Sequence, residues 1–128
     1  MGGTLYIVPE KGEAIKIKAF LKEETYVCPQ LKLREPMGDF WVSWSGNRLD
    51  LGYSFGSWLN GEWALAVGLE ICRRFKIKKA GWDSVGYCKN MEEFMRSKPM
   101  KHYYGFFPWQ KSKYRKWYIE QAKKIFEG

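Results

Sequence analysis

The chain has 128 residues, the usual size of one domain, and its 45% apolar and 28% charged residues are typical of a globular rather than a disordered protein. Its three cysteines, Cys28, Cys72 and Cys88, are odd in number and widely spaced, which argues against a disulfide framework and favours a reducing, cytoplasmic location. No apolar stretch approaches the ~20 residues that cross a membrane. We therefore expect one soluble α+β domain over residues 1–128, with no membrane partner.

Charge is distributed unevenly along the chain. Residues 1–70 carry 7 Lys/Arg and 9 Asp/Glu, a net charge of −2, whereas residues 71–128 carry 15 Lys/Arg and 5 Asp/Glu, a net charge of +10. An asymmetry of this size points to an anionic partner. Nucleic acid and an acidic protein surface both satisfy that condition, and charge alone does not choose between them.

The first part of the chain has the period-2 apolar pattern of β-strands. Residues 5–8 alternate before a turn at PEKGE, and residues 15–21 alternate again between apolar and basic positions. A helix also fits the second segment, but its β-branched residues favour a strand. Shorter strands are expected at 25–28 and 31–33, where neighbouring prolines limit their length.

A β-hairpin is predicted over residues 40–55, because Gly46-Asn47 suits a two-residue primed turn between two alternating segments. This turn sets a register that can be checked pair by pair. One face should hold the pairs Phe40–Tyr53, Val42–Leu51 and Trp44–Leu49, and the other Ser43–Asp50, Ser45–Arg48 and Trp41 covering Gly52.

A central buried helix is predicted over about residues 61–75, because nearly every position from 63 to 72 is apolar and no polar face remains. Asn60 precedes this run and has the side chain that most often caps a helix N-terminus. We therefore expect the helix to begin directly after Asn60.

Three further elements are expected beyond that helix. Residues 84–88 suit a short strand, Asn90 and Glu93 have the spacing of a capping box, and a last helix is predicted from about 109 to 126. The predicted architecture is an antiparallel sheet of about five strands, contributed by the N-terminal half, packed on one face by two or three helices from the C-terminal half.

The run RRFKIKK, residues 73–79, is the first candidate site. Cations at a helix C-terminus complement its dipole without any ligand, and Arg73 and Arg74 fit that role. The lysines lie beyond the reach of the dipole, in a pattern that predicts a strand with one basic face. Lys76, Lys78 and Lys79 are therefore candidate phosphate contacts, and a merely solvated charged face is the simpler alternative.

The aromatic segment HYYGFFPW, residues 102–109, is the second candidate. Exposed rings between basic segments are a common means of binding single-stranded nucleic acids, because bases stack on them. The alternative is that the rings fill the space between the last helix and the sheet, which is the commoner fate of aromatic residues. Tyr103 and Tyr104 are the candidates for exposure and stacking.

The start of the last helix is the third candidate. A cationic helix N-terminus is unfavourable against its own dipole, so a positive cluster there indicates a binding role. Further along, lysines and glutamates alternate at i,i+4 spacing, which lowers the local potential. The proposed contacts in the acid-free first turns are Lys111, Lys113, Arg115 and Lys116.

Enzyme chemistry has little support in the sequence, so we expect no catalytic residue, metal or cofactor. No glycine-rich phosphate loop is present. A Cys88–His102 nucleophile pair lacks a third member, and a zinc site would need distant cysteines rather than a close pair. The residues considered for these sites are Cys28, Cys72, Cys88 and His102 for zinc, and Asp39, Asp50 and Glu62 for magnesium.

These observations favour a small basic binding module, with nucleic acid, single-stranded or structured, as its partner. A protein-binding regulator or inhibitor, of the kind that mobile elements encode, is the alternative, because Trp, Tyr and Arg also anchor protein interfaces. An enzyme acting on a small substrate in an aromatic-lined pocket is the third hypothesis. The sequence leaves oligomeric state and the choice of DNA or RNA open.

Overall fold

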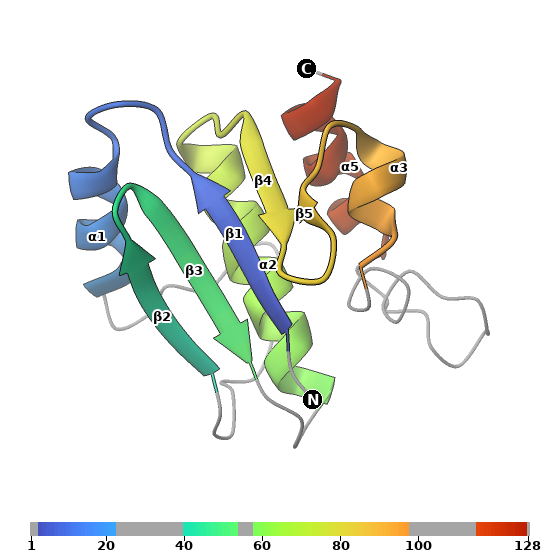
Figure 1. Ribbon diagram of the computed structural model, residues 1–128, viewed down its shortest axis with the longest axis horizontal. Coiled ribbons are helices and arrows are strands. Elements are labelled where there is room, and N and C mark those ends of the chain that lie inside the picture. Colours follow the sequence, from blue (N-terminus) through green and yellow to red (C-terminus); the bar gives the residue numbers. More distant parts are fainter. Residues whose placement is uncertain (1–2, 23–39, 54–57, 98–114, 128) are drawn as a thin grey trace.

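The computed structural model describes residues 3–22, 40–53, 58–97 and 115–127, with only the backbone for residues 40, 58–63 and 115. Five strands form one antiparallel sheet in the order β2-β3-β1-β4-β5, which places the first strand of the chain in the middle (Figure 1). The predicted α+β architecture is confirmed. The strands are β1 (Gly3–Val8), β2 (Phe40–Ser45), β3 (Arg48–Tyr53), β4 (Lys79–Trp82) and β5 (Gly86–Tyr87).

The helices of the described chain pack on one face of this sheet. Figure 1 shows α2 behind the strands, with α3 and α5 beside it next to β4 and β5, and α1 at the β2 side. Side chains from these helices join the strands in one apolar cluster. The helices are α1 (Ala14–Lys22), α2 (Trp58–Arg74), α3 (Met91–Met95) and α5 (Arg115–Phe126).

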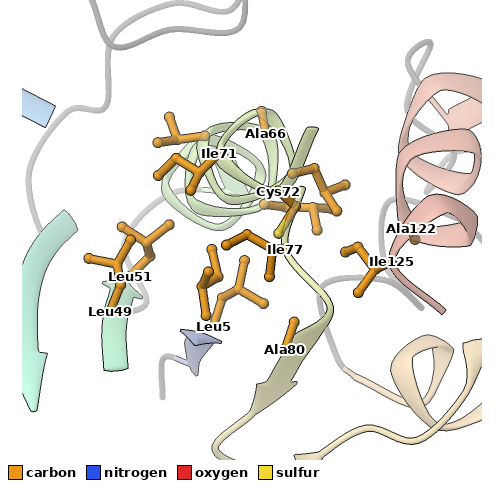
Figure 2. Packing of buried hydrophobic residues seen from close by; sticks show 14 of the residues in the cluster. Leu5, Leu49, Leu51, Ala66, Ile71, Cys72, Ile77, Ala80, Ala122 and Ile125 are labelled. Atoms are coloured by element: carbon orange, nitrogen blue, oxygen red, sulfur yellow. The ribbon is translucent and has the colours of Figure 1, made fainter. Parts of the chain in front are cut away.

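The core lies between α2 and the central strands. Leu5 and Leu51 are fully buried under α2, and Figure 2 shows them pointing toward that helix. A Cβ added at Gly68 would lie 2.1 Å from Leu5 Cδ2, so the missing side chain allows α2 to approach β1 closely. Each buried Leu or Ile contributes about 1.5–3 kcal/mol relative to exposure.

The hairpin forms with the predicted register. All six predicted pairs are present, from Phe40 opposite Tyr53 to Ser45 opposite Arg48. Gly46 has a φ of +63° and Asn47 does not have a positive φ, which is the pattern of a type II′ turn and one of the two primed turns that hairpins favour. Turn chemistry and strand pattern agree here, which explains why a local prediction succeeded.

Residues 15–21 are helical, so the predicted strand there is wrong. Ile17 and Phe20 are buried with helical spacing, whereas Ile15 is 77% exposed. The contact that decides is tertiary, because the Phe20 ring lies 6.2 Å from the Phe75 ring in an edge-on arrangement. The β-branched preference for strands spans only ~1 kcal/mol and gives way to packing of this kind.

Both ends of α2 also differ from the prediction. The helix begins at Trp58, so Asn60 lies inside it and is not its N-cap. The helix propensity of asparagine is only slightly unfavourable, so this residue alone does not determine where a helix begins. At the other end the chain turns with Lys76 at a φ of +50°, and the strand β4 begins only at Lys79. The predicted basic strand over residues 75–78 is therefore wrong.

The remaining predictions fall into two groups. The cap of α3 is confirmed, because the Asn90 side chain accepts a hydrogen bond of 2.9 Å from the Glu93 N–H, and α5 ends at Phe126 as expected. The strand predicted at 84–88 shortens to Gly86–Tyr87, since a turn occupies the residues before it. The strands expected at 25–28 and 31–33 lie outside the described residues, as does the predicted helix start at 109.

Candidate nucleic-acid interface

The sheet face away from the helices carries a group of part-buried and exposed polar and aromatic side chains. Alternation along β1 directs Leu5 and Ile7 to the core and Tyr6 to the opposite face. Tyr6 pairs with Asp50 on one side and with Gly81 on the other, and Gly81 pairs with Tyr87. No helix that the structure describes lies over this face (Figure 1). We call it the outer sheet face.

An arginine is held at the centre of the outer sheet face. Arg48 donates two hydrogen bonds to the Asp50 carboxylate, with Nε–Oδ1 and Nη2–Oδ2 distances of 2.7 and 3.0 Å. Its guanidinium carbon lies 4.0 Å from the centre of the Tyr6 ring. Hydrogen bonds to Asp50 and then to Tyr87 raise the pKa of Arg48, so the guanidinium stays charged at any working pH. This cation is fixed in place from two directions.

Tyr87 and Lys79 extend the site toward the β5 edge. The Tyr87 ring lies 6.2 Å from the Tyr6 ring at an angle of 54°, and 41% of Tyr87 is exposed. Lys79 Nζ lies 4.4 Å from the centre of the Tyr87 ring. A Cβ added at Gly81 would lie 2.2 Å from the carbonyl oxygen of Gly86, so glycine at this position is what permits β5 to pair closely and present Tyr87.

Trp41 supplies a further aromatic surface on the same sheet face, on β2. The indole lies directly over Gly52, because a Cβ added there would be 2.1 Å from Trp41 Cε2. This contact confirms the predicted cover of Gly52 by Trp41. The residue is nevertheless 45% exposed, which is unusual for the largest apolar side chain. An exposed ring held flat against a strand is ready to stack with a planar ligand.

The predicted basic contacts are only partly within the described chain. Lys76, Lys78 and Lys79 follow α2 and are exposed, and Lys116 is exposed on the first turn of α5. Because α2 and α5 run in the same direction in Figure 1, the end of α2 and the start of α5 lie at opposite ends of the helical layer. Among the described residues, Lys79 alone of the predicted lysines reaches the outer sheet face. Lys111, Lys113, Tyr103 and Tyr104 lie outside the described residues, and the Arg115 side chain is not described.

The two arginines at the start of the basic run have a structural role. Glu70 is completely buried, and its carboxylate accepts hydrogen bonds from Arg73 Nη2 at 2.6 Å and Arg74 Nε at 2.9 Å. Arg74 also lies over the Phe20 ring at 4.7 Å. These cations compensate a buried charge rather than await a ligand. Arg73 and Arg74 were not among the predicted phosphate contacts, and their pairing with Glu70 is consistent with that prediction.

The thiols have the wrong environment for nucleophilic catalysis. Burial raises the pKa of Cys72 far above its ordinary value, and burial together with the charge of Glu93 raises the pKa of Cys88 to about 11. A reactive cysteine needs a lowered pKa. Within the described ranges no three His, Cys, Asp or Glu side chains are placed to hold a metal ion. His102, Cys28 and Asp39 lie outside the described residues.

Tyr6 and Tyr87 were not among the sequence candidates. The alternation of residues 5–8 already predicted that Tyr6 faces away from Leu5 and Ile7. What the sequence could not supply was the strand order, which brings Arg48, Tyr6 and Tyr87 together from three strands. The signal that could have found them is a ring at the outward position of a strand that also carries buried aliphatic residues.

Comparison of the chain with protein-family models, with curated proteins and with solved structures yields no match. None of the helices within the described ranges has the length and apolar character needed to cross a bilayer. The chemistry of the outer sheet face is therefore the basis for a functional assignment.

Proposed function

We propose that this chain binds nucleic acid, using the outer sheet face and the lysines that follow α2. The observation that carries the proposal is the assembly of Arg48, Tyr6, Tyr87 and Lys79 from four different strands on a face free of described helices. Rings and cations within one site are the combination that engages bases and phosphates together. The charge of +8 on the whole chain supports an anionic partner.

The exposed lysines beside this face supply the phosphate contacts. Lys79 lies at the start of β4, on the outer face, and Lys76 and Lys78 precede it directly. Lys111, Lys113, Arg115 and Lys116 are proposed as a separate set of phosphate contacts, since the start of α5 lies at the opposite end of the helical layer from Lys76. Tyr103 and Tyr104 are proposed as further stacking residues. Each phosphate that a lysine neutralises releases counterions, so the affinity must depend on salt.

Binding of labelled oligonucleotides, measured by fluorescence anisotropy between about 50 and 300 mM salt, tests the proposal. We expect log affinity to fall linearly with log salt, and the slope to decrease by ~1 in each of the variants Lys76→Gln and Lys79→Gln. Lys124→Gln is the matched control, because Lys124 is exposed on α5, away from the outer sheet face; its slope should stay near that of the unaltered protein. Absence of binding at about 50 mM salt, where such contacts are strong, would refute the proposal.

An acidic protein surface is the competing partner, and the exposed Trp41 is the observation that favours it, since tryptophan often anchors protein interfaces. Capture of one stoichiometric protein that survives nuclease treatment, combined with no oligonucleotide binding, would replace the nucleic-acid proposal with this one. A nucleophilic role for either described thiol gains no support, because burial raises the pKa of both Cys72 and Cys88.

A further inference from the structure

From the contacts of Arg48, we infer that the partner is single-stranded nucleic acid. Its bases stack on a row of planar groups, whereas a duplex would be bound through its phosphates. The row consists of Tyr87, the Arg48 guanidinium over Tyr6, and Trp41. This inference rests on the proposed function and specifies its ligand class.

Arg48 offers its face rather than its edge to a ligand. An arginine that binds phosphate uses its fork of N–H donors, but Nε and Nη2 of Arg48 already donate to Asp50. The opposite side of the guanidinium lies on the Tyr6 ring. Of the three N–H donors that remain, one is shared with Tyr87. The guanidinium also keeps the face that Tyr6 does not cover, and bases stack on guanidinium planes as they do on aromatic rings. Asp50 is thus a positioning residue.

The charge at the centre of the outer sheet face also favours bases over phosphates. Asp50 offsets the charge of Arg48 within a bidentate pair, so the middle of the row is close to neutral. A phosphate placed there would meet the Asp50 carboxylate. Among the residues that the structure describes, the cation available for phosphates on this face is Lys79, which lies at the margin beside Tyr87. A neutral, planar centre with a cationic margin suits a strand whose bases turn inward and whose backbone runs along the edge.

The row crosses the strands. Tyr87 is on β5 and Trp41 is on β2, four strand spacings apart in the sheet order. Tyr87 and Tyr6 lie at the level of Ser43 on β2, and Trp41 lies two residues further along that strand, so the row runs obliquely. At about 4.8 Å per spacing and about 3.3 Å per residue along the strand, the row is roughly 20 Å long. Several bases fit along it, so we expect a footprint on the order of four nucleotides, the small end of the range for single-strand-binding folds.

The experiment compares a single-stranded 8-mer with a duplex of the same sequence against Tyr87→Ala, Trp41→Ala, Arg48→Lys and Asp50→Asn. We expect the single strand to bind at least tenfold tighter than the duplex. Tyr87→Ala and Trp41→Ala should each weaken its affinity about 5- to 100-fold, as removal of one stacking ring does, without changing the salt slope. Arg48→Lys should weaken binding although the charge is kept, because an ammonium has no plane.

Asp50→Asn separates the two roles of Arg48 most directly. If Asp50 holds the guanidinium flat, this variant weakens single-strand binding even though it removes a negative charge. If Arg48 contacts phosphate, the same variant frees its fork and tightens binding, which would overturn the inference. Thermal unfolding of each variant identifies any that fail to fold, and Lys124→Gln serves as the control for unchanged affinity.

The remaining outcomes distinguish this inference from the proposed function. In one outcome, duplex and single strand bind with equal affinity, and that affinity falls in Lys79→Gln but not in Tyr87→Ala or Trp41→Ala. This result would overturn the stacking row but not nucleic-acid binding. No binding of either oligonucleotide would remove both.

Discussion

Lys76 has a backbone conformation that ordinarily belongs to glycine. Its φ is +50°, and the Ile77 N–H donates to the carbonyl of Cys72 at 3.1 Å. A left-handed residue followed by such a bond is the Schellman termination of a helix. A lysine in that conformation carries a steric cost of roughly 1–2 kcal/mol that glycine avoids. The position therefore holds a charged side chain at the expense of local stability.

We predict that Lys76→Gly raises the free energy of unfolding by about 0.5–1 kcal/mol, the steric relief less the extra chain entropy that glycine loses on folding. Urea denaturation measures this change. Lys76→Ala is the control, because it removes the charge but keeps the strained Cβ, and should leave stability nearly unchanged. Under the proposed function both variants weaken nucleic-acid binding. A Lys76→Gly protein less stable than the Lys76→Ala protein would contradict the strain argument.

At the scale of elements, the helix α2 is coupled to α1 through one buried carboxylate. Glu70 is fully buried, and the side chains of its partners Arg73 and Arg74 are 36% and 37% exposed. Arg74 in turn covers Phe20 of α1. Replacing one member of such a network leaves the other charges without compensation. The helix end and the docking of α1 therefore depend on the same ion pairs.

We predict that Glu70→Gln lowers the free energy of unfolding by about 1–3 kcal/mol, a value below that of fully buried pairs because both arginines are partly solvated. Chemical denaturation followed by circular dichroism measures it. Glu92→Gln is the matched control, since the Glu92–Arg96 pair on α3 is exposed at both ends, and a change within about 0.5 kcal/mol is expected. Equal effects of the two variants would show that the Glu70 network contributes no more than a surface pair.

The element scale also shows where local patterns mislead. Alternating apolar and basic residues at 15–21 fit a strand and a helix alike, and the helix is the form that buries Ile17 and Phe20, with Phe20 packed on Phe75. The hairpin at 40–53 presented no such choice, because its turn residues and its strands specified the same register.

At the scale of the whole molecule, folding withdraws acidic groups from water: the Cys72 thiol already described, and also Cys88 and Tyr53. Burial, and to a smaller extent the charge of Glu93, raises the pKa of Cys88 to about 11, and burial followed by the charge of Asp83 raises that of Tyr53 to about 12. Their ordinary values are 9.0 and 10.0. Between the ordinary and the raised values, the folded protein holds protons that the unfolded chain has lost. Stability must then fall as pH rises.

We predict that the melting temperature decreases steadily as pH rises from about 9 to 12. Differential scanning calorimetry measures the decrease, and Cys88→Ser and Tyr53→Phe should each make it shallower by removing one of the groups. A melting temperature that stays flat or rises over this window would show that neither group is withdrawn from water in the folded protein.

The sequence by itself determined the parts of this protein that depend on neighbours along the chain. The α+β class, the hairpin with Trp41 over Gly52, the cap at Asn90 and the concentration of charge after residue 70 all follow from local rules. Each needs only residues that lie close together in the chain, and each was predictable for that reason.

Tertiary structure alone decided the helix at Ala14–Lys22 and the composition of the outer sheet face. Tyr6, Arg48, Lys79 and Tyr87 come from four strands, and the order β2-β3-β1-β4-β5 brings them together. Local pattern predicts which face of a strand a side chain occupies, but not which strand lies beside it, because strand order is set by packing of the whole core. The candidate site is a product of that order.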